Sequence, residues 1–196
     1  VCKNFSAAKN KRTVLKSDME SADAVARVIR EAQPPIVTIE NVPDYQGTVP
    51  FETIIKALED AGYTFDVGVY NSADFGGVQN RERLLIRAVK SGELPPIQEK
   101  TAPGDWYSAI EDLIESAPDS KFDSRSESEN WEMARIKDMV RKGKLDPSKP
   151  IITMGGSASR GLAAAANAGG PAPTLLSTSR SVPRIILPDG TVKRVT

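Results

Sequence analysis

Two consecutive prolines, Pro34 and Pro35, separate two stretches of different periodicity. Before them, apolar residues recur three and four positions apart, which is typical of one face of a helix. After them, Ile36–Ile39 form a short, mostly apolar and β-branched run, of the kind found in a buried parallel strand. Because proline cannot continue a helix, the pattern predicts a helix from Ser17 to the prolines and a strand that ends at Glu40–Asn41.

The two helices that flank this strand have recognisable boundaries. Ser17 and Glu20, three residues apart, match a capping box at the start of the first helix. After Pro50, apolar residues between 51 and 58 lie on one helical face, and Gly62 is placed to cap the end of a second helix.

The next residues predict two further strands. Residues 63–70 alternate in polarity, residues 71–77 are turn-like, and residues 84–89 are apolar. The order helix, strand, helix, strand, strand predicts an α/β fold: the C-terminal half of a doubly wound sheet whose last two strands form an antiparallel hairpin.

A stretch rich in proline, glycine and charge, residues 91–104, predicts a domain boundary, with domains at 1–92 and 93–196. The second domain is predicted to be small, irregular and mostly β. We expect short helices around 106–114 and 131–140, an exposed loop over 115–130, and glycine-rich loops at Gly155–Gly156 and Gly169–Gly170. The expected strands are Ile151–Met154, Thr174–Thr178, and Ile185–Leu187 paired with Thr191–Val195.

The residue inventory restricts the chemistry. The chain has no histidine and one cysteine, Cys2, so histidine-based triads are excluded and no metal site is predicted. Its 26 basic and 26 acidic residues balance, so attraction to nucleic acid must come from local patches. There are two candidate patches: residues 1–16, with five cations and no acid, and residues 180–196, with four cations and one acid. The lack of a long apolar run predicts a cytoplasmic protein with no membrane span.

Three separated motifs resemble the DNA (cytosine-5) methyltransferase family, in the family's order. Cys2–Ser6 is similar to its Pro-Cys-x-x-Phe-Ser loop, Glu40–Val42 to its Glu-Asn-Val strand end, and Gln79–Arg83 to its Gln-x-Arg-x-Arg motif. Pro171–Thr174 is similar to a Pro-x-Pro-Thr segment late in the target-recognition region. The resemblance implies methyl transfer from S-adenosylmethionine to C5 of cytosine in double-stranded DNA.

The resemblance also implies catalytic roles. Cys2 is the nucleophile that adds to C6 of cytosine, and Glu40 stabilises the charge that develops at N3. Arg83 holds the cytosine O2, and Arg81 supports Glu40, the thiolate or the nearby phosphate.

Because C6 is inaccessible in stacked DNA, the target base must leave the duplex. Residues of the nucleophile loop and the strand ends are expected to contact DNA: Ser6, Lys9, Lys11, Arg12, Asn41 and Gln79. Expected readers of the DNA sequence in the second domain are Arg160, Thr174, Thr178 and Arg180.

The family's cofactor loop precedes its nucleophile, so the main S-adenosylmethionine site is expected outside this chain, on a missing N-terminal half or a partner chain. Two other interpretations remain open: a non-catalytic DNA-binding or assembly module, and a transfer-RNA methyltransferase of the same superfamily.

Overall fold

The structure is a computed structural model that describes residues 13–157, 162–174 and 183–195. Within them the chain forms two compact units. The first comprises the described residues up to Asn71 together with Glu82–Glu99; the second comprises Ser72–Arg81 and the described residues from Lys100 onward. In this part of the chain every helix is too short or too polar to cross a lipid bilayer.

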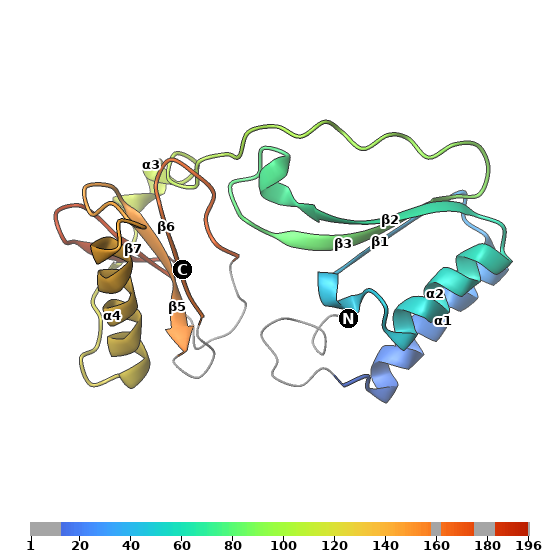
Figure 1. Ribbon diagram of the computed structural model, residues 1–196, viewed down its shortest axis with the longest axis horizontal. Helices are drawn as coiled ribbons and strands as arrows, with labels where there is room; N and C mark the ends of the chain where they lie inside the picture. Colours follow the sequence, from blue (N-terminus) through green and yellow to red (C-terminus); the bar gives the residue numbers. More distant parts are fainter. Residues whose placement is uncertain (1–12, 158–161, 175–182, 196) are drawn as a thin grey trace. The chain divides into compact units, whose positions relative to one another are not determined.

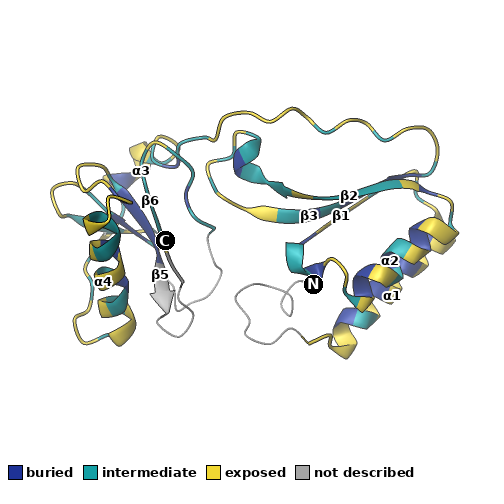
Figure 2. Ribbon diagram, viewed as in Figure 1, coloured by how far each residue is buried: buried dark blue, intermediate teal, exposed yellow. Residues whose placement is uncertain are grey.

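The first unit is a three-stranded antiparallel sheet with two helices on one face (Figure 1). The strands β1 (Ile36–Asn41), β2 (Thr64–Asn71) and β3 (Glu82–Val89) lie in the order β1-β3-β2. The helices are α1 (Lys16–Ala32) and α2 (Val49–Asp60). The core forms where they meet the sheet, and its most enclosed members include Ala26, Ile29, Leu58, Leu84 and Ile86. Figure 2 shows the outer sides of both helices exposed.

Both predicted helices, all three predicted strands and the predicted hairpin of β2 with β3 are present. Gly62, with φ +70°, follows α2 as expected of a helix end. The sequence therefore predicted the mixed α/β character of this region correctly.

Two expectations for this unit are wrong. β1 is not a buried parallel strand: it pairs antiparallel with β3, and alternate side chains point away from the helices, leaving Ile36 69% exposed. The predicted capping box at Ser17 is also displaced. The helix cap is Leu15, whose backbone N–H donates to Asp18 Oδ2 at 2.9 Å. A carboxylate at the third helical position satisfies this free N–H as glutamate does in a capping box.

The second unit contains a five-stranded antiparallel sheet in the order β4-β8-β7-β5-β6. Its strands are β4 (Asp119–Ser120), β5 (Ile151–Ser157), β6 (Leu162–Asn167), β7 (Arg184–Ile186) and β8 (Val192–Arg194). The helices are α3 (Glu111–Ile114) and α4 (Glu127–Arg141). The predicted hairpin across residues 188–190 is present as β7 and β8.

Several local predictions for this unit fail. The first helix is only α3, because Asp105 accepts hydrogen bonds from the backbone of Tyr107 and Ser108 and forms a turn there. α4 begins inside the predicted loop 115–130, where the Ser126 hydroxyl accepts a bond from the backbone N–H of Glu129 at 3.4 Å.

The glycine and alanine segments also differ. Gly155–Gly156 lie within β5, not in a loop, and the pairing with β6 shifts register there. β6 was not predicted, because its sequence is mostly alanine, a poor strand former. Thr174 lies outside any strand, and the rest of the predicted strand at 175–178 falls outside the described residues.

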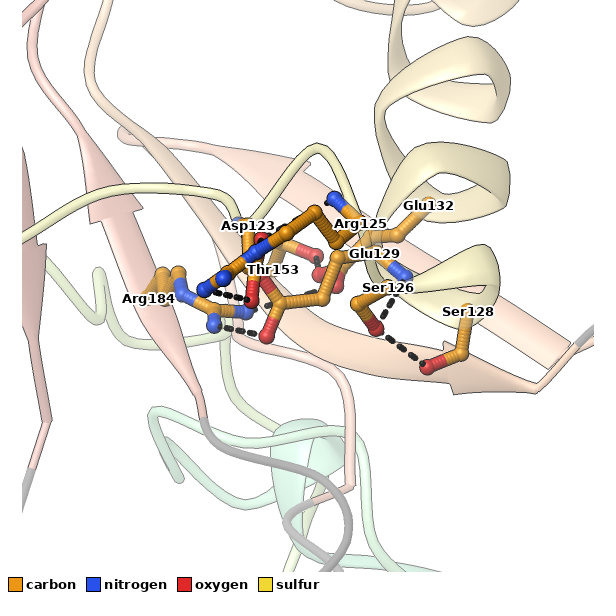
Figure 3. Close-up of polar contacts among 8 residues, drawn as sticks. All are labelled: Asp123, Arg125, Ser126, Ser128, Glu129, Glu132, Thr153 and Arg184. Atoms are coloured by element: carbon orange, nitrogen blue, oxygen red, sulfur yellow. Dashed lines mark hydrogen bonds and ion pairs between the residues drawn. The ribbon is translucent and has the colours of Figure 1, made fainter.

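A buried charged cluster joins α4 to the sheet (Figure 3). Arg184 of β7 contacts Glu129 at 2.6 Å and Glu132 at 3.6 Å, and the Thr153 hydroxyl donates to Glu132. Glu132 is 1% exposed and Arg184 is 7% exposed. Because buried charges are costly unless paired, these contacts hold one face of α4 against β5 and β7.

Candidate active site and nucleic-acid contacts

Glu40 and Arg83 form an ion pair across the junction of β1 and β3. Glu40 lies opposite Leu85 in the antiparallel register, and Arg83 lies two positions before Leu85 on the same strand. Side chains two positions apart share a face of the sheet, so Arg83 is the diagonal neighbour of Glu40 and its long side chain spans the gap. Arg83 Nε lies 2.5 Å from Glu40 Oε1.

The pair is accessible to a ligand. Arg83 is 21% exposed and Glu40 is 49% exposed in their side chains. Arg83 Nη1 also donates to the backbone carbonyl of Glu82 at 2.7 Å, which fixes the direction of the guanidinium. A carboxylate beside an oriented guanidinium offers hydrogen-bond acceptors and donors side by side, which suits the polar edge of a heterocyclic base.

Asn41 lies next to Glu40 but points to the opposite face. Its side chain is buried, and its Oδ1 accepts a hydrogen bond from the backbone N–H of Val42 at 2.9 Å. The expected contact of Asn41 with DNA stays a prediction, while this bond braces the chain as it leaves β1 for the short helix η1 (Pro43–Tyr45).

Tyr45 at the end of η1 is enclosed by the core. Its ring packs edge-on against Phe51 with the ring centroids 6.2 Å apart, and it is only 4% exposed. Burial, with a smaller contribution from the negative charge of Asp18, raises the pKa of Tyr45 to about 12. The turn that follows Glu40 is thereby anchored in the apolar core of the first unit.

The segment Gln79–Arg81 is extended and leads into β3, where Arg83 lies. Gln79 forms an isolated parallel bridge with Ala172, and the Ser72 hydroxyl donates to the Gln79 carbonyl at 2.6 Å. Arg81 is exposed. The structure fixes the backbone of this motif from two sides, and the roles of its side chains stay predictions.

Thr174, an expected reader of DNA, is described, and its hydroxyl donates to the backbone carbonyl of Asn80. The remaining predicted site residues fall outside the described part of the chain: Cys2, Ser6, Lys9, Lys11, Arg12, Arg160, Thr178 and Arg180. Their assignments rest on the sequence alone.

The sequence reasoning missed two supporting residues of the site. Ser72 hydrogen bonds to the arginine motif, Gln79–Arg83, and Tyr45 anchors the turn after Glu40. A serine seven residues before a motif carries no recognisable signal. A tyrosine four residues after the end of a predicted strand was a detectable apolar anchor.

The comparisons with known proteins agree with the motif analysis. A sequence model of the family described as C-5 cytosine-specific DNA methylase matches residues 2–163. The type II methylase M.HgiDII of Herpetosiphon aurantiacus is 36% identical over 95 residues, covering 46% of this chain and 26% of the relative. The type II methyltransferase M1.BsuMI of Bacillus subtilis is 35% identical over 115 residues, covering 53% and 26%.

The chain therefore spans about a quarter of the length of these curated relatives. Among solved structures, the Dnmt2 methyltransferase of S. pombe matches with 21% identity and a TM-score of 0.36, covering 47% of this chain and 30% of that one.

Proposed function

This chain belongs to the C-5 cytosine-specific DNA methylase family, and from that premise we propose that it takes part in methylating C5 of cytosine in double-stranded DNA. The methyl group comes from S-adenosylmethionine. The names of the relatives as type II methyltransferases support a role in a restriction-modification system. In this proposal residues 1–92 carry the chemistry, and residues 93–196 read the DNA sequence.

The observation that carries the proposal is the ion pair between Glu40 on β1 and Arg83 on the neighbouring strand β3. C5 of cytosine is a weak nucleophile until a thiolate adds to C6. In that step the Cys2 sulfur forms a bond to C6, the C5–C6 double bond breaks, and electron density moves toward N3. Glu40 in its protonated form donates its carboxyl proton to N3 and so neutralises that density, and Arg83 donates to the O2 on the same edge of the ring.

The described residues offer no strand followed by a glycine-rich turn into a helix, the arrangement that commonly holds nucleotide cofactors. No described residue is therefore assigned to S-adenosylmethionine. The steps proposed for the chain are the flipping of the base, the addition of the thiolate and the stabilisation of the adduct. Once C5 carries the methyl group, loss of the C5 proton to water re-forms the C5–C6 double bond, breaks the bond between sulfur and C6 and frees Cys2 as a thiolate.

Trapping a covalent adduct tests this proposal without the methyl donor. Duplex DNA with 2-pyrimidinone at the target position accepts a thiolate at the carbon equivalent to C6. We expect the protein to form an adduct with this DNA that survives a denaturing gel, and Cys2→Ala to form none. Glu40→Gln, which has the same shape but no acidic proton, should slow adduct formation by about 100-fold, within the usual range for general acid–base groups.

Lys56→Ala is the matched control, since Lys56 is an exposed member of an ion pair on α2 in the same unit as Glu40. It should form the adduct at the wild-type rate. An adduct with transfer RNA and none with DNA would instead identify an RNA methyltransferase. If neither nucleic acid gives a Cys2-dependent adduct, the non-catalytic binding module is the better description.

A further inference from the structure

The extended segment Val78–Arg81 is hydrogen bonded along both of its edges. On one edge lies Ser72, at the start of the short helix η2 (Ser72–Asp74). The Ser72 backbone N–H donates to the carbonyl of Arg81 at 3.1 Å, and its hydroxyl donates to the carbonyl of Gln79 at 2.6 Å. One serine thus satisfies two carbonyls on the same side of the arginine motif.

On the other edge lies a segment more than 90 residues later in the chain. The Ala172 N–H donates to the carbonyl of Val78 at 2.8 Å, and the Asn80 N–H donates to the carbonyl of Ala172 at 2.7 Å. The Thr174 hydroxyl then donates to the carbonyl of Asn80. Four successive carbonyls, from Val78 to Arg81, are bonded alternately on the two edges.

The approach to this segment leaves little freedom. Gly77 lies so close to Ser72 that a Cβ at position 77 would be 2.6 Å from the Ser72 carbonyl oxygen. Gly76 has φ +79°, a conformation that favours glycine. The turn into the arginine motif is thus fixed by sterics, and the motif itself by hydrogen bonds on both edges.

The chemistry of a hydroxyl limits what Thr174 can do. A threonine has a single O–H proton to donate. While that proton is given to the Asn80 carbonyl, it cannot be given to a phosphate or a base. Asn80 lies between Gln79 and Arg81. The Thr174 hydroxyl therefore restrains the backbone that carries both of these site residues.

We propose that Thr174 is a positioning residue for Arg81 and not a reader of the DNA sequence. Its hydroxyl and the two backbone hydrogen bonds of Ala172 tie the segment at 172–174 to residues 78–80 and set the backbone from which Arg81 extends. These three hydrogen bonds are called the latch. The inference rests on the proposed function, because it assigns Arg81 to the reaction. It departs from the sequence-based expectation that Thr174 contacts DNA.

Two substitutions at this position separate the two roles. Thr174→Val keeps the shape and removes the proton, and Thr174→Ser restores it. For each we would measure the dissociation constant of duplex DNA at several salt concentrations and the rate of adduct formation with 2-pyrimidinone DNA at saturation. We expect Thr174→Val to slow adduct formation at saturating DNA about tenfold, as for one lost hydrogen bond. The dissociation constant and the slope of log K against log salt (the salt slope) should be unchanged. Thr174→Ser should recover the wild-type rate within about threefold.

The opposite pattern would overturn the proposal. If Thr174 contacts a phosphate, Thr174→Val should weaken DNA binding, reduce the salt slope by about one and leave the saturated rate intact. Thr191→Val is the matched control, because Thr191 hydrogen bonds to Asp189 in a turn of the same unit. It should change neither quantity, although it loses a comparable side-chain contact.

Amide hydrogen exchange tests the latch without DNA. In Thr174→Val the amides of Asn80 and Ala172 should exchange about tenfold faster than in the wild type, while Thr191→Val leaves them unchanged. Unchanged exchange in Thr174→Val would refute the latch even if the protein methylates DNA. Faster exchange in a protein that forms no adduct would leave the latch standing and reject the proposed reaction.

Discussion

Tyr45 illustrates how one buried side chain can hold a site residue in place. It lies five residues after Glu40, and its backbone N–H donates to the Val42 carbonyl at 3.0 Å. Its carbonyl in turn accepts the Thr48 hydroxyl at 2.7 Å, and this same hydroxyl accepts from the first turn of α2. Tyr45 therefore connects the end of β1 with the beginning of the next helix.

The raised pKa of Tyr45 predicts a loss of stability at alkaline pH. In the unfolded chain the phenol ionises near 10.0, whereas in the folded protein its pKa is about 12. Between these values the unfolded state alone loses the proton, so the contribution to stability is complete below pH 10 and declines as pH rises toward 12. The full difference corresponds to roughly 3 kcal/mol.

Urea unfolding of wild type and Tyr45→Phe at several pH values from 8 to 11.5 measures this effect. Phenylalanine keeps the ring and cannot ionise, so the wild type should lose stability relative to Tyr45→Phe as the pH rises. Parallel curves would show that Tyr45 does not carry the alkaline sensitivity. The comparison cancels the other tyrosines and the lysines, which both proteins share.

At the scale of elements, α4 is attached to its sheet by charge as well as by apolar contact. Its Glu129 and Glu132 meet Arg184 of β7, whose guanidinium also lies over the ring of Phe122, 4.7 Å from the centroid. Arg184 Nε is buried without a hydrogen-bond partner among the described residues. The arrangement fixes which face of α4 meets the sheet.

Arg184→Met should destabilise the second unit by about 3–5 kcal/mol, because it removes the positive charge and leaves a buried carboxylate without compensation. Chemical unfolding followed by a probe in this unit would measure the loss. Adding Glu132→Leu to that variant should recover only part of it, since an apolar pair replaces the buried Arg184–Glu132 pair but the buried Thr153 hydroxyl loses its acceptor. A loss below about 1 kcal/mol for Arg184→Met would mean that the carboxylates find other partners or water.

Elements with strong periodicity and clear boundaries were predictable from the sequence. α1, α2 and the β2–β3 hairpin follow from apolar spacing, prolines and Gly62. β6 was not, because its alanines gain their strand conformation from pairing with β5. The start of α4 was hidden by a run of serine and glutamate that is typical of loops.

The candidate site was predictable in its residues but not in its contacts. Motif similarity indicated Glu40 and Arg83, yet only the register of β1 on β3 shows that they meet. The latch between Asn80 and Thr174 could not be predicted, because nothing local in either segment specifies a pairing across more than 90 residues.

At the scale of the whole molecule, charge is balanced, so the proposed DNA contact depends on where the cations lie. Lys9, Lys11 and Arg12 lie within four consecutive positions of the sequence, in a stretch without acids. If each neutralises one phosphate, replacing all three by glutamine should reduce the slope of log K against log salt by roughly three.

Binding to a fluorescent duplex between 50 and 300 mM salt measures this slope. The control replaces three exposed cations by glutamine: Lys56 on α2, Lys137 on α4 and Lys142 directly after α4. The control has the same net charge but should keep the wild-type slope. Equal slopes for the two triple variants would show that the basic stretch does not face the phosphates.

The strand order of the first unit has a consequence for synthesis of the chain. β3, the central strand, is the last of the three to leave the ribosome, and β1 and β2 do not pair with each other. α1 and α2 can associate earlier, but neither outer strand has a partner in this sheet until residues 82–89 emerge. The strand that completes the sheet also carries Arg83, so the nascent chain brings Glu40 and Arg83 together only in the step that closes the fold.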